Sequence, residues 1–436
     1  MISLHRMQRR FLLSGLLAAL ALSAAACADE TPTFAGEDQF PPGAISVTRE
    51  VILPASEFFR SLGSFSGYTR ASDLASVVVA NRYQGVLDAH ALARFGPFPS
   101  TVAYRRDGVE KRDAAFRYTN SSLVLRVDTL ASTDGPVTVQ VWQAAQAWER
   151  TSATWTTAID TGAVETPWTE PGGTRGTLLA EGTFAGNAAA GDTLVLSLTG
   201  ASVASLADTL SNGVVITTAT GGARLEVIDL VVRAGVRPDS ASPDTTVVQS
   251  VTASARTTVY TPEQPDPGPG VLAVGGVRSA RTLIELNPDR PLPACAAGET
   301  CGTIAFRDVQ LNQVDLLLRP VPVPSGFGAI TGVPLSLRVA SEAELGAGAP
   351  LGPRVLDQSS VTGVRTYNAA PGDTLVAVPI TGVSRTLAVA DTLPRTFALI
   401  SELQFFDSPP TFGVAFFDAQ PRLRIIYTLP ARRRLP

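Results

Sequence analysis

The chain has 436 residues, of which 45% are hydrophobic and 17% charged, and its formal net charge is −4. This length allows two or three domains with cores of their own, and the acidic balance argues against a nucleic-acid partner, which would require a basic surface for the phosphates. Thr, Val, Leu, Gly and Pro are abundant, which favours strands and turns over helices.

Residues 1–26 have the pattern of a secretory signal peptide. Several arginines precede a short apolar run, and small residues then lead to Cys27. The run is too short for a stable membrane span. A cysteine directly after the small-residue site resembles a bacterial lipobox, which implies cleavage before Cys27 and a lipid on its thiol. Simple secretion with an unmodified thiol is the alternative. Residues 27–44 are polar and rich in Pro and Gly, which predicts a flexible tether.

Strand patterns fill the rest of the chain. Residues 143–150 are the one stretch expected to form a helical turn, and 156–176 are expected to form a long loop. The predicted strands are 45–53, 76–80, 89–95, 122–127, 137–142, 177–180, 193–198, 214–218 and 224–232, followed by 250–254, 257–260, 271–274, 281–286, 314–319, 335–339 and 421–427. Many short strands without a βαβ rhythm predict antiparallel sandwiches.

One sequence feature occurs twice. A Gly-Asp-Thr-Leu-Val stretch begins at Gly191 and again at Gly372, and each copy is followed by a second Asp-Thr-Leu and a closing Arg-Leu strand. The repeat predicts a duplicated β domain. The Asp and Thr residues of the repeat are expected to cap turns rather than bind metal.

The predicted fold class is therefore all-β, with two tandem antiparallel β-sandwich domains of jelly-roll type after a lipoprotein signal peptide. The first domain is predicted to span residues 45–236 and the second 250–430. Residues 237–249 contain polar residues and prolines, which are typical of a linker, and 431–436 form a tail.

Two cysteines remain beside Cys27. Cys295 and Cys301 are separated by five residues of a Gly- and Ala-containing loop. In an exported chain this spacing predicts a disulfide that closes the loop. A metal site is disfavoured because no His lies nearby, and no cofactor is expected.

Three segments of the chain resemble the DNRLRE domain family, which consists of exported bacterial β-sandwich modules often found beside carbohydrate-active regions. These are Ala91–Phe95, the Trp-containing segment Ala147–Trp155 and the closing strand Pro421–Tyr427. The middle segment departs from the family pattern at its Glu and Val positions. The resemblance implies two copies of a sandwich similar to carbohydrate-binding modules.

The four tryptophans lie in one stretch of the first half. Trp148, Trp155 and Trp168 are candidate ligand-binding residues, because an indole face can stack on a sugar ring. Trp168, in a Pro-Trp-Thr-Glu-Pro loop, is expected to be the most exposed. The alternative is that these side chains pack in the core, which is the prediction for Trp142 at the end of an alternating strand.

No residue pattern predicts catalysis. His90 is the only His after the signal peptide and lies in an apolar strand, so it is expected to be structural or solvent-exposed, and no Gly-x-Ser-x-Gly elbow accompanies it. Carboxylate pairs can hydrolyse glycosides, but nothing in the sequence fixes two of the candidates at a working distance. The candidates are Asp73, Asp88, Asp160, Glu165 and Glu170.

The sequence thus favours a non-catalytic, exported protein held by a lipid at a bacterial membrane, at the outer membrane or cell surface, with a polysaccharide as the leading partner. The first alternative is an adhesion or envelope-assembly component that binds another protein. The second is a glycan-cleaving enzyme. A row of exposed aromatics would favour the sugar, a free sheet edge the protein partner, and two facing carboxylates the enzyme.

Overall fold

The structure is a computed structural model, and it describes most of the chain after residue 47. The described residues are 48–186, 191–241, 245–287, 289–294, 302–340, 348–354, 367–382, 384–385, 396–401 and 411–429. The predicted signal peptide (1–26), tether (27–44) and tail (431–436) lie outside them. Within them the fold is all-β, as predicted, and the strand ladders are antiparallel.

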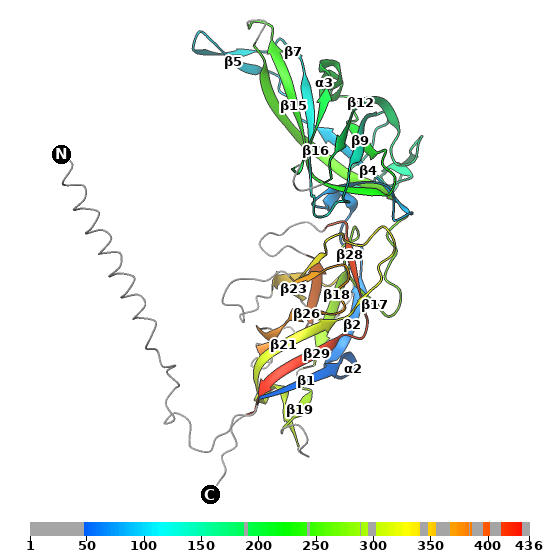
Figure 1. The fold of residues 1–436 in the computed structure, drawn as a ribbon, viewed down its shortest axis with the longest axis vertical. Helices are drawn as coiled ribbons and strands as arrows, with labels where there is room; N and C mark the ends of the chain where they lie inside the picture. Colours follow the sequence, from blue (N-terminus) through cyan, green and yellow to red (C-terminus); the bar gives the residue numbers. More distant parts are fainter. Residues whose placement is uncertain are drawn as a thin grey trace, which may run out of the picture.

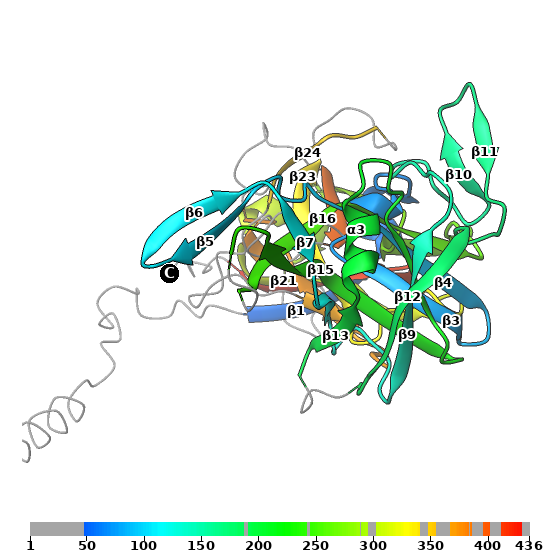
Figure 2. The same ribbon diagram turned by 90° about the horizontal axis from the view of Figure 1, so that it is seen from above.

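The upper lobe in Figure 1 consists of residues 71–261. Its elements are β3 (Val77–Tyr83), β4 (Leu87–Phe95), β5 (Val102–Arg106), β6 (Val109–Asp113), β7 (Phe116–Tyr118), β8 (Ser121–Val127), β9 (Val137–Ala144), β10 (Thr157–Asp160), β11 (Glu165–Pro167), β12 (Arg175–Phe184), β13 (Thr193–Leu198), α3 (Gly200–Ala207), β14 (Val214–Thr218), β15 (Ala223–Pro238) and β16 (Val247–Thr261), together with the 3₁₀ turn η2 (Ala71–Asp73). The main sheet has the order β12-β9-β14-β4-β16-β15-β8-β13, and β3 pairs with both β4 and β15. Two hairpins, β5-β6 and β10-β11, project from the body (Figure 2).

The lower lobe consists of residues 48–65 and 271–429. Its elements are β1 (Thr48–Pro54), α2 (Ala55–Phe58), β2 (Phe59–Phe65), β17 (Val271–Gly275), β18 (Arg281–Leu286), β19 (Pro291–Pro293), β20 (Thr303–Ala305), η4 (Phe306–Asp308), β21 (Gln310–Leu318), β22 (Pro320–Val321), β23 (Val333–Ala340), β24 (Leu351–Arg354), β25 (Tyr367–Ala369), β26 (Val376–Pro379), β27 (Thr396–Ser401), β28 (Val414–Asp418) and β29 (Arg422–Thr428). Its larger sheets have the orders β1-β29-β21-β26 and β2-β18-β27-β23-β24, and a smaller one the order β17-β28-β22.

The repeat in the sequence corresponds to a repeat in strand order. In the upper lobe the Asp-Thr-Leu strand β13 pairs with β8, which pairs with β15, which pairs with β3. In the lower lobe β26, β21, β29 and β1 follow in the same order. The facing strands also correspond, with β12-β9-β14-β4-β16 in one lobe and β24-β23-β27-β18-β2 in the other.

The lobes do not follow the predicted domain boundaries of 45–236 and 250–430. Strands β1 and β2, near the N-terminus, pair with β29 and β18 of the lower lobe. The predicted linker 237–249 instead joins β15 to β16, which are neighbours in one sheet. Strand β16, expected to open the second domain, belongs to the upper lobe. The pattern of a strand shows which face is buried but not which sheet it joins, so these pairings could not be predicted from local sequence.

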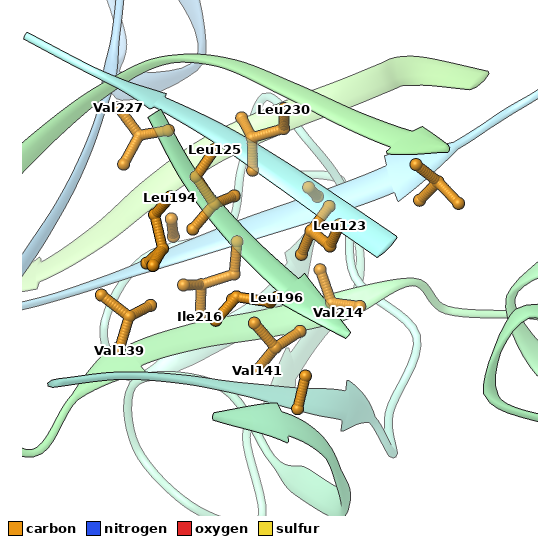
Figure 3. Close-up of a cluster of buried hydrophobic side chains, with 14 of the residues drawn as sticks. Leu123, Leu125, Val139, Val141, Leu194, Leu196, Val214, Ile216, Val227 and Leu230 are labelled. Atoms are coloured by element: carbon orange, nitrogen blue, oxygen red, sulfur yellow. The ribbon is translucent and has the colours of Figure 1, made fainter. Parts of the chain in front are cut away.

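Alternating apolar residues build the core of each lobe. In β13 the residues Leu194, Leu196 and Leu198 are buried, whereas the residues between them are exposed. Figure 3 shows side chains of β8 and β13 meeting those of β9 and β14 in the upper core. The lower lobe has a similar core between its two larger sheets. These strands form because period-two alternation buries one face of each sheet.

Short helices differ from the prediction. Residues 143–150 do not form a helical turn: β9 continues to Ala144, and no helix follows it before residue 150. Helix α3 was not predicted. Its N-cap is Thr199, whose side chain accepts a hydrogen bond from the Ser202 backbone N–H at 3.1 Å, and such caps favour helix formation.

A third apolar cluster joins the two lobes. It combines upper-lobe residues such as Val78 and Leu87 with lower-lobe residues such as Phe327 and Phe412. Arg224, at the start of β15, lies fully buried at this junction. Its guanidinium donates hydrogen bonds to the Gly328 carbonyl oxygen at 2.8 Å and to Glu226 Oε1 at 2.9 Å. The junction is therefore a packed interface with a buried ion pair.

Candidate functional site

The four tryptophans gather in one cluster, the tryptophan cluster, on the outer face of the upper sheet. Trp148 and Trp168 pack there against Val215 of β14, and Trp142 and Trp155 lie at the margin. The segment between β9 and β12 carries three of the four. The cluster covers the outer face of β14, which is why all five residues of that strand are buried.

Two of the three candidate ligand-binding tryptophans are buried. Trp148 is 3% exposed and donates its indole N–H to the Asn212 carbonyl oxygen at 2.8 Å. Trp168 is 6% exposed and donates to the Thr154 carbonyl oxygen at 2.9 Å. The prediction that Trp168 is the most exposed was wrong, because the loop folds back and offers its indole a backbone acceptor. Buried indole faces cannot stack on a sugar.

Trp155 is the candidate that reaches the surface, where it is half-buried. Its ring centroid lies 4.8 Å from that of His90, and the His90 Nδ1 lies 2.7 Å from the Gly172 carbonyl oxygen. Burial lowers the pKa of His90 below its usual value, so the imidazole is neutral at pH 7. His90 is therefore a structural support for Trp155, consistent with the prediction.

A groove of about 320 Å³ lies beside Trp155. We call it the Trp155 groove. It is bounded by the segment Thr151–Thr156, by the end of β16 at Thr258–Thr261, and by Arg70 and Glu263. The groove thus offers aromatic surface from Trp155 and Tyr260, several threonine hydroxyls, one guanidinium and one carboxylate.

Tyr260 forms part of the groove wall in its neutral form. Burial raises the pKa of Tyr260 to about 12, and the negative charge of Glu263 acts in the same direction. Its ring packs edge-on against Phe327 and Phe412 of the lobe junction. Arg70 and Glu263 are exposed at the rim. Sequence reasoning missed these three residues, because β16 and the segment before β3 meet only through the fold.

The five candidate carboxylates do not converge on the groove. Asp73 lies 3.6 Å from Arg150, and Glu170 lies 3.6 Å from Arg175, in exposed ion pairs. Glu165 accepts a hydrogen bond from the Thr157 hydroxyl, and Asp88 and Asp160 accept bonds from backbone N–H groups. Each of them has a local structural partner, and none lines the groove.

Two acidic residues of the repeat cap turns, as predicted, whereas Asp192 pairs with Arg126 at 3.5 Å and Asp391 lies outside the described residues. Asp208 accepts a hydrogen bond from the Leu210 N–H at 2.8 Å, and Asp373 accepts one from the Ala370 N–H at 2.9 Å. Across the residues that the structure describes, no three His, Cys, Asp or Glu side chains gather in a way that could hold a metal ion. In the same residues, no helix has the length and apolar composition needed to cross a membrane. Cys27, Cys295 and Cys301 lie outside the described residues.

Comparisons with known proteins do not assign the chain to a family. No family profile matches it, and no curated protein is significantly similar. A protein described as secreted, from Parabacteroides distasonis, is 9% identical, with 86% of this chain and 99% of that one aligned at a TM-score of 0.19. The Macrobrachium rosenbergii nodavirus structure is also 9% identical, with 89% and 99% covered at a TM-score of 0.12. Likeness at this level carries no argument about fold or function.

Proposed function

We propose that the chain is an exported, non-catalytic binding protein that holds a polysaccharide in the Trp155 groove. The observation that carries the proposal is the composition of the groove, which combines an indole and a phenol with a hydroxyl-rich rim. The C–H face of a sugar ring packs on aromatic carbon, while its hydroxyls bond to small polar side chains. Arg70 and Glu263 add one donor group and one acceptor group that suit neighbouring sugar hydroxyls.

A binding role fits the groove better than hydrolysis. Glycoside hydrolysis generally uses two carboxyl groups that face each other across the sugar bond. Among the residues that line the groove, Glu263 is the one carboxylate. We therefore expect retention of an intact glycan.

The test is a glycan array and pull-down with the full chain. Trp155→Ala is expected to abolish retention of the bound glycan, because it removes the stacking surface. Trp142→Ala is the matched control, since Trp142 is also half-buried and belongs to the same cluster but lies outside the groove. The proposal fails if no glycan binds, or if Trp142→Ala weakens binding as much as Trp155→Ala. Release of shortened glycan would favour the enzyme alternative.

We also propose that a lipid on Cys27 holds the protein at a bacterial membrane. The support is the lipobox-like sequence around this residue. Cys27→Ser is expected to move the protein from the membrane fraction to the soluble fraction, with an unprocessed leader. Unchanged fractionation would show that the anchor is not at this thiol.

The proposed disulfide has support from its described neighbours. The Ala294 N–H donates to the Gly302 carbonyl oxygen at 3.0 Å, where the β19-β20 hairpin ends. Ala294 is bonded to Cys295 and Gly302 to Cys301. The Cα atoms of bonded neighbours are about 3.8 Å apart, so this hydrogen bond favours a short distance between the two cysteines. The two thiols of Cys295 and Cys301 are then expected to resist alkylation until a reductant is added. Labelling without reductant would contradict the disulfide.

A further inference from the structure

The N-terminal part of β16, residues 247–252, has a free edge. Residues 247–252 pair with β15 on one side. Pairing with β4 on the other side begins only at Ala253. No other described strand pairs with β16. Val248, in this segment, is 62% exposed.

The hydrogen-bond pattern shows which backbone groups face this edge. Gly235 of β15, which lies opposite Val248, accepts a bond from Thr119 N–H and donates one to Ser121 Oγ, so it points away from β16. In an antiparallel ladder such pairs alternate with pairs that bond each other. Val248 and Ser250 therefore direct their N–H and C=O groups to the open side.

The same alternation holds at the next position. The Thr252 carbonyl oxygen accepts a hydrogen bond at 3.3 Å from the Gly96 N–H, on the open side of β16. Thr252 is two residues beyond Ser250, so it must point in the same direction. Gly96 thus covers the end of the edge, and the groups of Val248 and Ser250 lie just beyond this cover.

This edge lacks the usual protection. Residues 245–252 read Thr-Thr-Val-Val-Gln-Ser-Val-Thr, without a charge or a proline. Exposed edges are normally blunted by charges, prolines or bulges. The edge strand β1 has such features, with exposed Glu50 and with Pro54 at its end. The open part of β16 is instead rich in β-branched residues, which favour a further strand.

We propose that this edge is an interface between two copies of the chain, which pair antiparallel about a two-fold axis at Gln249. Val248 of one copy then lies opposite Ser250 of the other, and the two such pairs exchange four backbone hydrogen bonds. Val247 lies opposite Val251 of the second copy, where both belong to the apolar face of the strand.

A second copy is the occupant that the edge fits best. Two identical uncharged edges satisfy each other's open groups and bring no like charges together in the strand. Two-fold pairing is also the commonest way in which soluble chains assemble. The edge is separate from the Trp155 groove, so the interface extends the proposed function and does not depend on it.

Cross-linking of the full chain tests the register. Gln249 would face Gln249 of the second copy at a non-hydrogen-bonded position, where Cα atoms lie about 4.5 Å apart, a separation that a disulfide can span. Gln249→Cys is expected to give a disulfide-linked dimer on a non-reducing gel. Val195→Cys is the control, since Val195 is 56% exposed on β13 and paired to β8, and it should stay monomeric.

The mass of the full chain in solution tests the interface itself. The unaltered chain is expected to have twice the monomer mass at tens of micromolar. Val248→Pro removes an outward N–H without disturbing the ladder to β15 and should halve that mass, whereas Val248→Thr should preserve the dimer. A monomeric unaltered chain together with no cross-link from Gln249→Cys would overturn the proposal. If Val248→Pro fails to fold, the cross-link and the mass of the unaltered chain still decide.

Discussion

Replacing Arg224 by methionine should weaken the junction between the lobes. The guanidinium is fully buried, bonds to Glu226 Oε1 and the Gly328 carbonyl oxygen, and lies over the ring of Phe412 at 5.6 Å. Methionine keeps most of the apolar volume but none of the donors. Glu226, which is 3% exposed, would lose its positive partner.

The expected loss follows from these contacts. Breaking a buried ion pair by removing one partner costs about 3–5 kcal/mol, because the group left behind must either stay charged without a partner or be neutralised. Solvent does not screen the attraction between Arg224 and Glu226, because both side chains are buried. Burial already raises the pKa of Glu226, against the opposing charge of Arg224. Arg224→Met should therefore leave a carboxyl that takes up a proton in the folded state.

The double variant Arg224→Met/Glu226→Leu separates charge from packing. It should recover most of the stability lost by Arg224→Met, because no unpaired charge remains. The assay is urea unfolding at pH 7 followed by tryptophan fluorescence, which reports on the upper lobe. A loss below about 1 kcal/mol, the size of one ordinary hydrogen bond, would refute the reasoning. So would a double variant as unstable as the sum of the two single changes.

Three further predictions concern the tryptophan cluster. Burial lowers the folded-state pKa of His90. The contribution of neutral His90 to the free energy of unfolding is therefore full above about pH 6.5 and is lost as the pH falls through the folded-state pKa. The urea midpoints at pH 7 and pH 5 should differ less in His90→Gln than in the unaltered chain. Gly172→Ala places a Cβ 2.7 Å from the His90 ring at φ +81° and should cost about 1–3 kcal/mol, whereas Gly162→Ala, with φ +76° and no atom within 4 Å, should cost less. Trp168→Phe loses the bond to Thr154 and should cost about 1 kcal/mol in thermal unfolding; equal melting temperatures would contradict this.

Much of the fold could be predicted because it depends on local alternation. Leu194 and Leu196 alternate with exposed residues, and such a pattern identifies a strand and its buried face. The repeated Asp-Thr-Leu also predicted the correspondence between β13 and β26, which occupy equivalent places in their sheets. Helix α3 was not predicted, because its residues are mostly small, although Thr199 is a typical N-cap residue.

The candidate site was harder to predict, because burial of an aromatic depends on distant contacts. Trp168 has polar and proline neighbours in sequence, but Thr154 supplies a backbone acceptor that allows it to be buried. Trp155 instead lies beside the end of β16, where it lines the groove. An indole with one polar atom suits either setting, so the sequence could not separate the two. The free edge of β16 likewise depends on sheet order.

The pairing of β1 with β29 has a consequence for how the protein is made. Glu50 and Arg424, which form an ion pair across these strands, are 374 residues apart. A chain that emerges from its N-terminus presents β1 and β2 first, long before their partners exist, while residues 71–261 can already close their own sheet. Strand β2 must then wait for β18, and β1 for the last strand, β29. A prematurely terminated chain would display β1 without a partner, so a protease that recognises extended segments could distinguish an unfinished molecule from a complete one.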